Sequence, residues 1–165
     1  MAVAEIQTLA DSPSVPSLDA LDKTKIAGSW KCVAVEGNFQ EFMKAMGVGW
    51  MKRKMAATFS FGKGRMVQTI SFAKGGKLTL HIKMGPIKET NAIILDGKLR
   101  KQKIPPGVDG EASSELSKDG NAIIFKVASK GLESRRFVDD AGRMRVELSC
   151  KGAKAARIFE RSDAL

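Results

Sequence analysis

Most of the chain after residue 65 alternates hydrophobic and polar residues with a period of two. In residues 77–84, for example, Leu78, Leu80, Ile82 and Met84 share one face of an extended segment. Such alternation predicts half-buried β-strands. We expect ten strands, over residues 28–36, 65–73, 77–84, 88–95, 98–103, 110–117, 121–129, 132–138, 143–150 and 153–160.

Short turn sequences separate these segments at intervals of about ten residues. Asp96-Gly97 and Asp119-Gly120 are two of them, and such dipeptides between alternating runs are typical of antiparallel hairpins. A meander of ten strands leaves exposed edges unless it closes on itself. The expected fold is therefore all-β, a ten-stranded antiparallel up-and-down β-barrel, and a barrel of this size encloses a cavity.

One passage, between the first two strands, has helical periodicity instead. Asn38 is suited to cap a helix, and Gly47 to end it. A second short helix is expected over residues 48–57, so that a helix-turn-helix caps one open end of the barrel. The apolar stripe of the first helix, at i, i+3, i+4 and i+7, is Phe39, Phe42, Met43 and Met46.

The net charge of +10 adds one alternative to this picture. The basic residues are spread from Lys23 to Arg161, and the longest run covers only residues 52–54. No basic tail and no aromatic-basic motif of an RNA-binding module is present. The charge still leaves open a basic β-barrel that binds nucleic acid or acidic membrane surfaces without an internal ligand.

The residue types that catalysis needs are sparse. His81 is the single histidine, and it falls on the polar face of its strand. Cys32 and Cys150 lack metal-ligand spacing and lie in strand-like segments, where free, buried thiols are common. No nucleophile-base pair and no Gly-rich phosphate loop is evident. We therefore expect neither an enzyme nor a metal or cofactor site.

The first 25 residues differ from the rest. They are small and polar and contain Pro13 and Pro16, which predicts a flexible N-terminal extension before one domain over residues 26–165. The chain shows no basic start followed by an apolar run and no stretch of membrane-spanning length, so a cytoplasmic protein is expected.

The last strands interrupt the apolar faces with charge. Arg157 shares a face with Phe159, and Arg136 lies on a similar face of residues 132–138. If these faces point inward, two guanidinium groups enter the barrel, where each needs an anion such as a carboxylate. Parity leaves open that both arginines face solvent or pair with glutamates. The candidate glutamates are Glu111, Glu115 and Glu147.

Both ends of the barrel segment resemble one family. The sequence GSWKCVAVEGNFQEFMKAMGVGW resembles the first strand and portal helices of the intracellular fatty-acid-binding and retinoid-binding proteins, which are lipid carriers of the calycin type. The sequence RMRVELSCKGAKAARIFER resembles their closing hairpin, which ends in Arg-x-Tyr-Glu. The resemblance spans about residues 26 to 161 and implies a clam-shaped barrel that holds a ligand inside.

The resemblance implies a long-chain fatty acid or a similar hydrophobic carboxylate, such as retinoic acid, as the ligand. The family holds the carboxylate with two arginines and a tyrosine, which correspond to Arg136, Arg157 and Phe159, with Arg135 as the register alternative to Arg136. The chain contains no tyrosine, so two arginines, or one plus a water molecule, would hold the acid. The retention of both arginines favours an acid over neutral retinol.

The resemblance also implies an apolar wall and a basic surface at the entrance. Such a surface would dock on acidic membranes during ligand transfer, although it could equally be a solvated face. We expect a monomer. The predicted wall residues are Phe39, Met43, Met46, Leu80, Ile82, Ile94, Phe125, Val146 and Leu148, and the predicted basic portal residues are Lys44, Lys52, Arg53 and Lys54.

The chain departs from the family pattern at three internal places. An extra residue lies between Trp30 and Asn38, and about seven extra residues precede the second strand near residues 58–64. The loop at residues 104–109 also does not match.

Overall fold

A computed structural model describes residues 21–104 and 108–163. The predicted extension over residues 1–25 lies mostly outside the described residues. The strands are β1 (Gly28–Gly37), β2 (Met66–Ala73), β3 (Lys77–Met84), β4 (Ile87–Ile94), β5 (Arg100–Ile104), β6 (Val108–Leu116), β7 (Ile123–Val127), β8 (Leu132–Val138), β9 (Met144–Cys150) and β10 (Ala153–Arg161).

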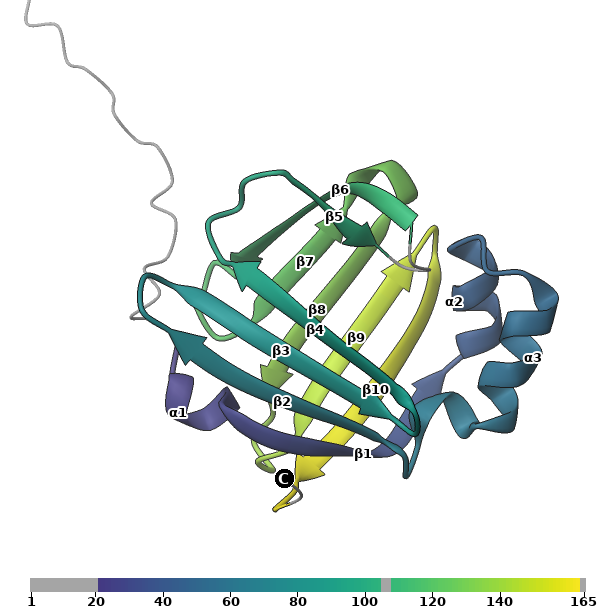
Figure 1. Cartoon of the computed structure of the whole chain (residues 1–165), viewed down its shortest axis with the longest axis horizontal. Helices are drawn as coiled ribbons and strands as arrows, with labels where there is room; N and C mark the ends of the chain where they lie inside the picture. The colour runs from purple at the N-terminus through teal and green to yellow at the C-terminus, as the bar shows by residue number, and fades with distance from the viewer. Residues whose placement is uncertain (1–20, 105–107, 164–165) are drawn as a thin grey trace, which may run out of the picture.

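The ten strands form one antiparallel sheet in the order β4-β3-β2-β1-β10-β9-β8-β7-β6-β5. Consecutive strands pair except β4 and β5, and the first strand pairs with the last, so that the sheet curls around a common interior (Figure 1). The predicted ten-stranded clam is confirmed. Within the described residues β4 and β5 do not pair, and a cavity of about 150 Å³, lined in part by Lys77, Ile93 and Arg100, lies at this opening.

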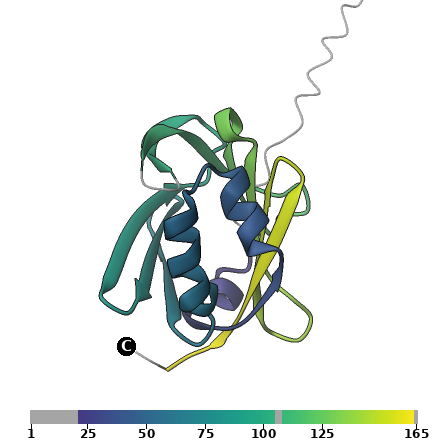
Figure 2. The same cartoon turned by 90° about the vertical axis from the view of Figure 1, so that its right-hand side faces the viewer.

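Two helices cross one end of the sheet, α2 (Phe39–Ala45) and α3 (Trp50–Thr58), and Figure 2 shows them side by side. The backbone N–H of Glu41 donates to Asn38 Oδ1 over 3.1 Å, as the predicted N-cap requires. Gly47, at φ +85°, ends α2. None of the helices in the described part of the chain combines the length and apolar character of a membrane span.

The helix α3 begins two residues later than predicted. The backbone N–H groups of Gly47 and Val48 donate to the carbonyls of Lys44 and Met43, each over 3.0 Å. This is the Schellman pattern that closes a helix. Val48 is buried and completes the end of α2, so α3 starts only at Trp50.

The largest core cluster lies on the inner face of the curled sheet. Trp30, Met144 and Phe159 have no solvent exposure. A short helix, α1 (Lys23–Ile26), packs beneath them, and the Trp30 indole donates to the Ile26 carbonyl over 2.9 Å. Leu21 is also buried in this core. Residues that pack against the barrel therefore begin before residue 26, the predicted start of the domain.

A β-bulge in β1 absorbs the extra residue that precedes Asn38. The register against β10 pairs Cys32 with Phe159 and then Ala34 with Ile158, so Val33 is the extra residue of the bulge and has no paired residue on β10. Strict alternation would place Ala34 on the face of Cys32. The bulge reverses the parity, so that Val35, which pairs with Arg157, is on the inner face instead.

The register of β4 corrects one predicted wall residue. Ile93 pairs with the inward-facing Leu78, whereas Ile94 pairs with Lys77 on the outer face. The prediction that Ile94 lines the interior is therefore wrong, and Ile93 packs against the core in its place. Two adjacent isoleucines at the end of a strand gave no periodic signal to choose between them.

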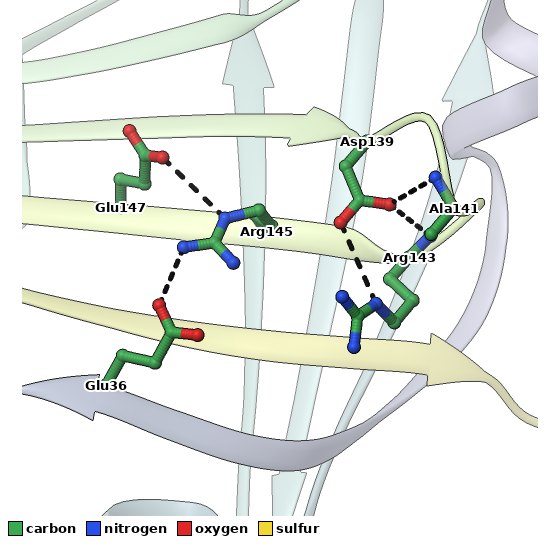
Figure 3. A network of polar contacts seen from close by, with 6 residues as sticks. All are labelled: Glu36, Asp139, Ala141, Arg143, Arg145 and Glu147. Carbon is green, nitrogen blue, oxygen red and sulfur yellow. Dashed lines mark hydrogen bonds and ion pairs between the residues drawn. The ribbon is translucent and has the colours of Figure 1, made fainter.

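The outer face carries an ion-pair network over β10 (Figure 3). Arg145 on β9 donates to Glu36 on β1 over 2.8 Å, across the intervening strand, and its Nε lies 3.7 Å from Glu147. In the adjoining turn Asp139 accepts from the backbone of Arg143 and lies 3.7 Å from its guanidinium. These charges occupy the face on which Ala156 and Ile158 are buried.

Candidate ligand-binding site

Two arginines lie in one cross-strand row on the inner face of the sheet. Val146 on β9 pairs with Arg157 on one side and with Arg136 on the other. Residues in register across a sheet share a face, and Val146 is buried in the core. Arg157 and Arg136 therefore both belong to the interior, separated by one strand.

The register alternative between Arg135 and Arg136 is now decided. Arg135 is exposed, and its guanidinium lies 5.1 Å from the ring of its outer-face neighbour Phe137. Arg136 instead donates from Nη1 to Gln68 Oε1 inside the barrel. The same Nη1 lies 3.8 Å from the Met144 sulfur. Arg136 is thus the interior member of the pair.

The environment of Arg136 disfavours its charge. Burial, and secondarily the positive charge of Arg157, lower the pKa of Arg136 to about 10. Its hydrogen-bond acceptor, Gln68, is neutral and only 4% exposed. The guanidinium therefore remains protonated at neutral pH, and the part of the chain that the structure describes supplies no carboxylate that pairs with it.

Arg157 is held by neutral groups as well. Its Nε donates to the backbone carbonyl of Phe61 over 2.9 Å, and its guanidinium carbon lies 4.6 Å from the centre of the Phe39 ring. Burial lowers the pKa of Arg157. Burial also raises the pKa of the nearby Cys32 thiol, an effect that the Arg157 charge opposes.

The glutamates proposed as partners are engaged elsewhere or exposed. Glu115 pairs with Lys126 over 3.1 Å, Glu147 lies beside Arg145, and Glu111 is exposed on β6. Among the residues that the structure describes, no carboxylate forms an ion pair with either interior arginine. Two interior guanidinium groups without an acidic partner among the described residues leave positive charge that an anion would offset.

Phe159 lies on the same face of β10 as Arg157, two residues further on, and is fully buried. Its ring offers no hydrogen-bond donor, unlike the tyrosine of the family motif. It pairs with Cys32 on β1 and with Met144 on β9, and the three side chains form an apolar surface next to the arginines. Its contribution at this position is hydrophobic contact.

Two groups at this site were absent from the sequence prediction. Gln68 could have been found, because it is a polar residue flanked by the buried Met66 and Ile70 on the inner face of β2. The Phe61 carbonyl could not, since a backbone acceptor carries no sequence signal. It lies in η2 (Ser60–Gly62), inside the stretch of about seven extra residues.

The remaining predicted wall residues belong to the packed interior or its margin. Phe39 is buried, and Met43 on α2 and Met46 at its C-cap are half-buried against the same hydrophobic cluster. Leu80 is buried, and Ile82 packs at the edge of the same cluster. Phe125, Val146 and Leu148 occupy the inner faces of β7 and β9.

The predicted basic portal residues differ from one another in exposure. Lys44, Lys52 and Lys54 are exposed, whereas Arg53 is half-buried and donates to the Val48 carbonyl over 2.6 Å. The same helix α3 has no buried residue. It exposes its large apolar side chains, namely Trp50 (65%), Met51 (63%) and Met55 (58%).

Residues 21–104 and 108–163 contain no group of three or more His, Cys, Asp or Glu side chains that could hold a metal ion. His81 is exposed on the outer face, as its place on the polar face of the strand predicts, and its Nδ1 lies 2.8 Å from the Thr90 hydroxyl.

The fold is a curled ten-stranded antiparallel sheet that carries two arginines on its inner face. No protein-family model matches the chain. "Fatty acid-binding protein 5" of Pygoscelis papua is 29% identical over 142 residues, which cover 82% of this chain and 95% of the relative. The REP1-NXSQ fatty acid transporter aligns with a TM-score of 0.71 at 25% identity, over 86% of this chain and 99% of the transporter.

Two further solved structures agree with this fold. A tyrosine-to-phenylalanine mutant of the same transporter also has a TM-score of 0.71, at 26% identity over 84% of this chain and 99% of its own. Fatty-acid-binding protein 1 of Echinococcus granulosus, at 17% identity, shares the fold with a TM-score of 0.69 over 84% of this chain and 98% of its own. The chain is thus similar in sequence and in fold to fatty-acid-binding proteins.

Proposed function

We propose that the protein is a carrier that binds a long-chain fatty acid or a similar hydrophobic carboxylate inside the barrel. The observation that supports this most directly is the pair of interior arginines, Arg136 and Arg157, whose hydrogen-bond partners among the described residues are neutral. A carboxylate would supply the missing charge, and its acyl chain would extend among apolar side chains. The fatty-acid-binding proteins among the relatives support the same ligand class.

The two parts of such a ligand contribute differently to affinity. Burial of a methylene group gains about 0.8 kcal/mol, so a sixteen-carbon tail gains on the order of 12 kcal/mol before the costs of binding. One hydrogen bond to a charged group adds about 1.5–3 kcal/mol. The tail therefore provides most of the affinity, whereas the arginines select the headgroup and fix the direction in which the ligand lies.

Two measurements test the carrier function. Native mass spectrometry of the freshly purified protein should reveal a co-purified acyl chain, which organic extraction would identify. Isothermal titration calorimetry should then show that Arg157→Gln weakens palmitate binding at least about tenfold and leaves hexadecanol binding nearly unchanged. Equal palmitate affinity in the variant would rule out the headgroup role of Arg157.

The same preparation tests the alternative that the barrel binds nucleic acid. A protein that neutralises several phosphates binds polynucleotides with a steep dependence on salt concentration. We expect only weak binding, because the basic residues are dispersed and the described site faces inward. Tight, steeply salt-dependent binding without any extractable lipid would favour the alternative.

We further propose that α3 contacts an acidic membrane surface when the ligand is transferred. The exposed Trp50, Met51 and Met55 lie on the same helix as the exposed Lys52 and Lys54. Apolar and aromatic side chains beside cations are the composition of interfacial membrane helices. In this proposal the protein is a cytoplasmic, monomeric carrier without catalytic activity, and α3 is its docking surface.

A further inference from the structure

The turn η2 (Ser60–Gly62) enters the interior beside Arg157. Three successive residues in it have left-handed backbone angles, with φ of 51° at Ser60, 53° at Phe61 and 99° at Gly62. Positive φ is uncommon for residues other than glycine and is maintained only when surrounding contacts require it. One of the contacts of this turn is a hydrogen bond with the Arg157 guanidinium.

A hydrogen bond and a ring stack join the turn to Arg157. The Phe61 carbonyl accepts from Arg157 Nε over 2.9 Å. The Phe61 ring stacks on Phe39 at 5.2 Å with an interplanar angle of 18°, and Phe39 lies under the Arg157 guanidinium. A Cβ atom added at Gly62 would lie 3.7 Å from Arg157 Nε. The turn therefore packs closely against the arginine rather than merely passing near it.

The end of the turn is attached to the sheet. The backbone N–H of Gly64 donates to the Cys32 carbonyl on β1 over 2.8 Å. A Cβ added at Gly62 would lie only 3.1 Å from Met66 Cβ at the start of β2, so the turn also packs closely against β2. The Phe61 carbonyl thus belongs to a turn that contacts both β1 and β2.

This acceptor determines which nitrogens Arg157 can offer to a ligand. A carboxylate can bind a guanidinium through Nε and one terminal nitrogen, or through the two terminal nitrogens. Since Phe61 occupies Nε, the terminal edge is the one left for the ligand. A guanidinium that is already held in place also loses less side-chain freedom when the ligand binds.

We propose that the Ser60–Gly62 turn is the positioning element of the carboxylate site, with the Phe61 carbonyl holding Arg157 so that its terminal nitrogens meet the acid. This inference rests on the proposed carrier function. It assigns a binding role to the segment that the family pattern lacks, and it makes the selection of acids over neutral lipids depend on a backbone group as well as on the arginines.

A pair of substitutions at one position isolates the carbonyl. Phe61→Gly removes the ring but accepts φ near 53° without strain, whereas Phe61→Pro removes the ring and confines φ to about −65°, which displaces the carbonyl. Titration calorimetry should show about tenfold weaker palmitate binding for the proline variant than for the glycine variant. Hexadecanol affinity should differ by less than about twofold between them.

A second pair does not depend on proline. Gly62→Ala forces a Cβ against Met66 and towards Arg157, whereas Gly64→Ala, also at positive φ, has no atom within 4 Å of the added Cβ. Only Gly62→Ala should reduce the ratio of palmitate to hexadecanol affinity. Circular dichroism and thermal unfolding would identify variants that are folded at the titration temperature.

The expected signature is coupling to Arg157. In an Arg157→Gln background, the glycine and proline variants at position 61 should bind palmitate equally. The inference is overturned if folded variants of both pairs keep the wild-type selectivity, or if palmitate and hexadecanol weaken to the same extent. If Arg157→Gln alone leaves palmitate affinity unchanged, the proposed carboxylate site itself fails.

Discussion

Arg136 on β8 donates a hydrogen bond to Gln68 on β2, across the interior of the barrel. The two strands are separated in the sheet by β1, β10 and β9, so this contact joins opposite walls and not neighbouring strands. It satisfies one donor of a buried cation without neutralising its charge. The charge thus remains available to an anionic ligand.

Replacement of Gln68 tests whether that remaining charge binds the ligand. Gln68→Glu would place a carboxylate beside Arg136 and should weaken palmitate binding by about tenfold or more, because the internal pair competes with the ligand. Gln68→Leu removes the acceptor and adds no charge. It should lower the free energy of unfolding of the unliganded protein by about 1–3 kcal/mol while keeping palmitate affinity.

Calorimetry and urea unfolding of the two variants would separate these effects. Equal palmitate affinity in Gln68→Glu and Gln68→Leu would show that the charge on Arg136 does not act on the ligand.

The adjacent residues Arg135 and Arg136 form a matched pair on opposite faces of β8. Arg136→Gln should reduce palmitate affinity by about tenfold, since it removes one of the two interior charges. Arg135→Gln has the same change in net charge but lies on the exposed face, and it should leave the affinity unchanged. A similar loss in both variants would point to the overall charge of the protein instead of the interior site.

Trp50 provides a direct reporter of membrane docking. The chain has two tryptophans, of which Trp30 is fully buried and Trp50 is 65% exposed. Vesicles containing phosphatidylserine should therefore shift the fluorescence emission to shorter wavelength through Trp50 alone, and added salt should weaken the effect.

A surface residue of similar exposure supplies the control for docking. Trp50→Ala should abolish the fluorescence shift and slow the transfer of a fluorescent fatty acid to vesicles. Leu99→Ala changes a side chain that is 62% exposed in the loop between β4 and β5, away from α3 (Figure 1). Slower transfer in both variants would count against α3 as the docking surface.

The outer ion-pair network predicts a small dependence of stability on pH. The hydrogen bond from Arg145 and its charge lower the pKa of Glu36. The stabilisation by this pair is therefore present above about pH 4.3, the unfolded value, and is lost as the pH falls through the lower pKa of the folded protein. Since Glu36 is exposed, we expect less than about 1 kcal/mol.

Urea unfolding of Glu36→Gln against the wild type at several pH values would measure this contribution. The difference in unfolding free energy should be present at pH 6, decline towards zero in acid, and shrink in high salt. Glu133→Gln on the exposed side of β8, where the described residues provide no ion pair, is the control. A difference that stayed constant down to pH 2 would contradict the role of the ionised pair.

Much of the fold follows from local patterns. The predicted strands over residues 77–84 and 132–138 coincide with β3 and β8, and Asn38 caps α2 as expected. These features depend on alternation, turn dipeptides and capping, which act between residues near in sequence. Alternation also grouped Arg157 with the face that proved to be the inner one.

The site required the tertiary structure. Whether Arg135 or Arg136 faces inward, which of Ile93 and Ile94 does, and where β1 bulges were all set by strand register. Register depends on pairing between distant segments, and a shift of one residue reverses every face.

The hydrogen-bond partners of the two interior arginines are distant in sequence, so no local pattern predicts them. Gln68 is 68 residues from Arg136, and the Phe61 carbonyl is 96 residues from Arg157. The sequence by itself determined that arginines interrupt the alternating apolar pattern of two strands near the end of the chain. Only the curling of the sheet, which brings β2 and η2 against β8 and β10, decided that neutral acceptors hold these groups and leave their charge unbalanced.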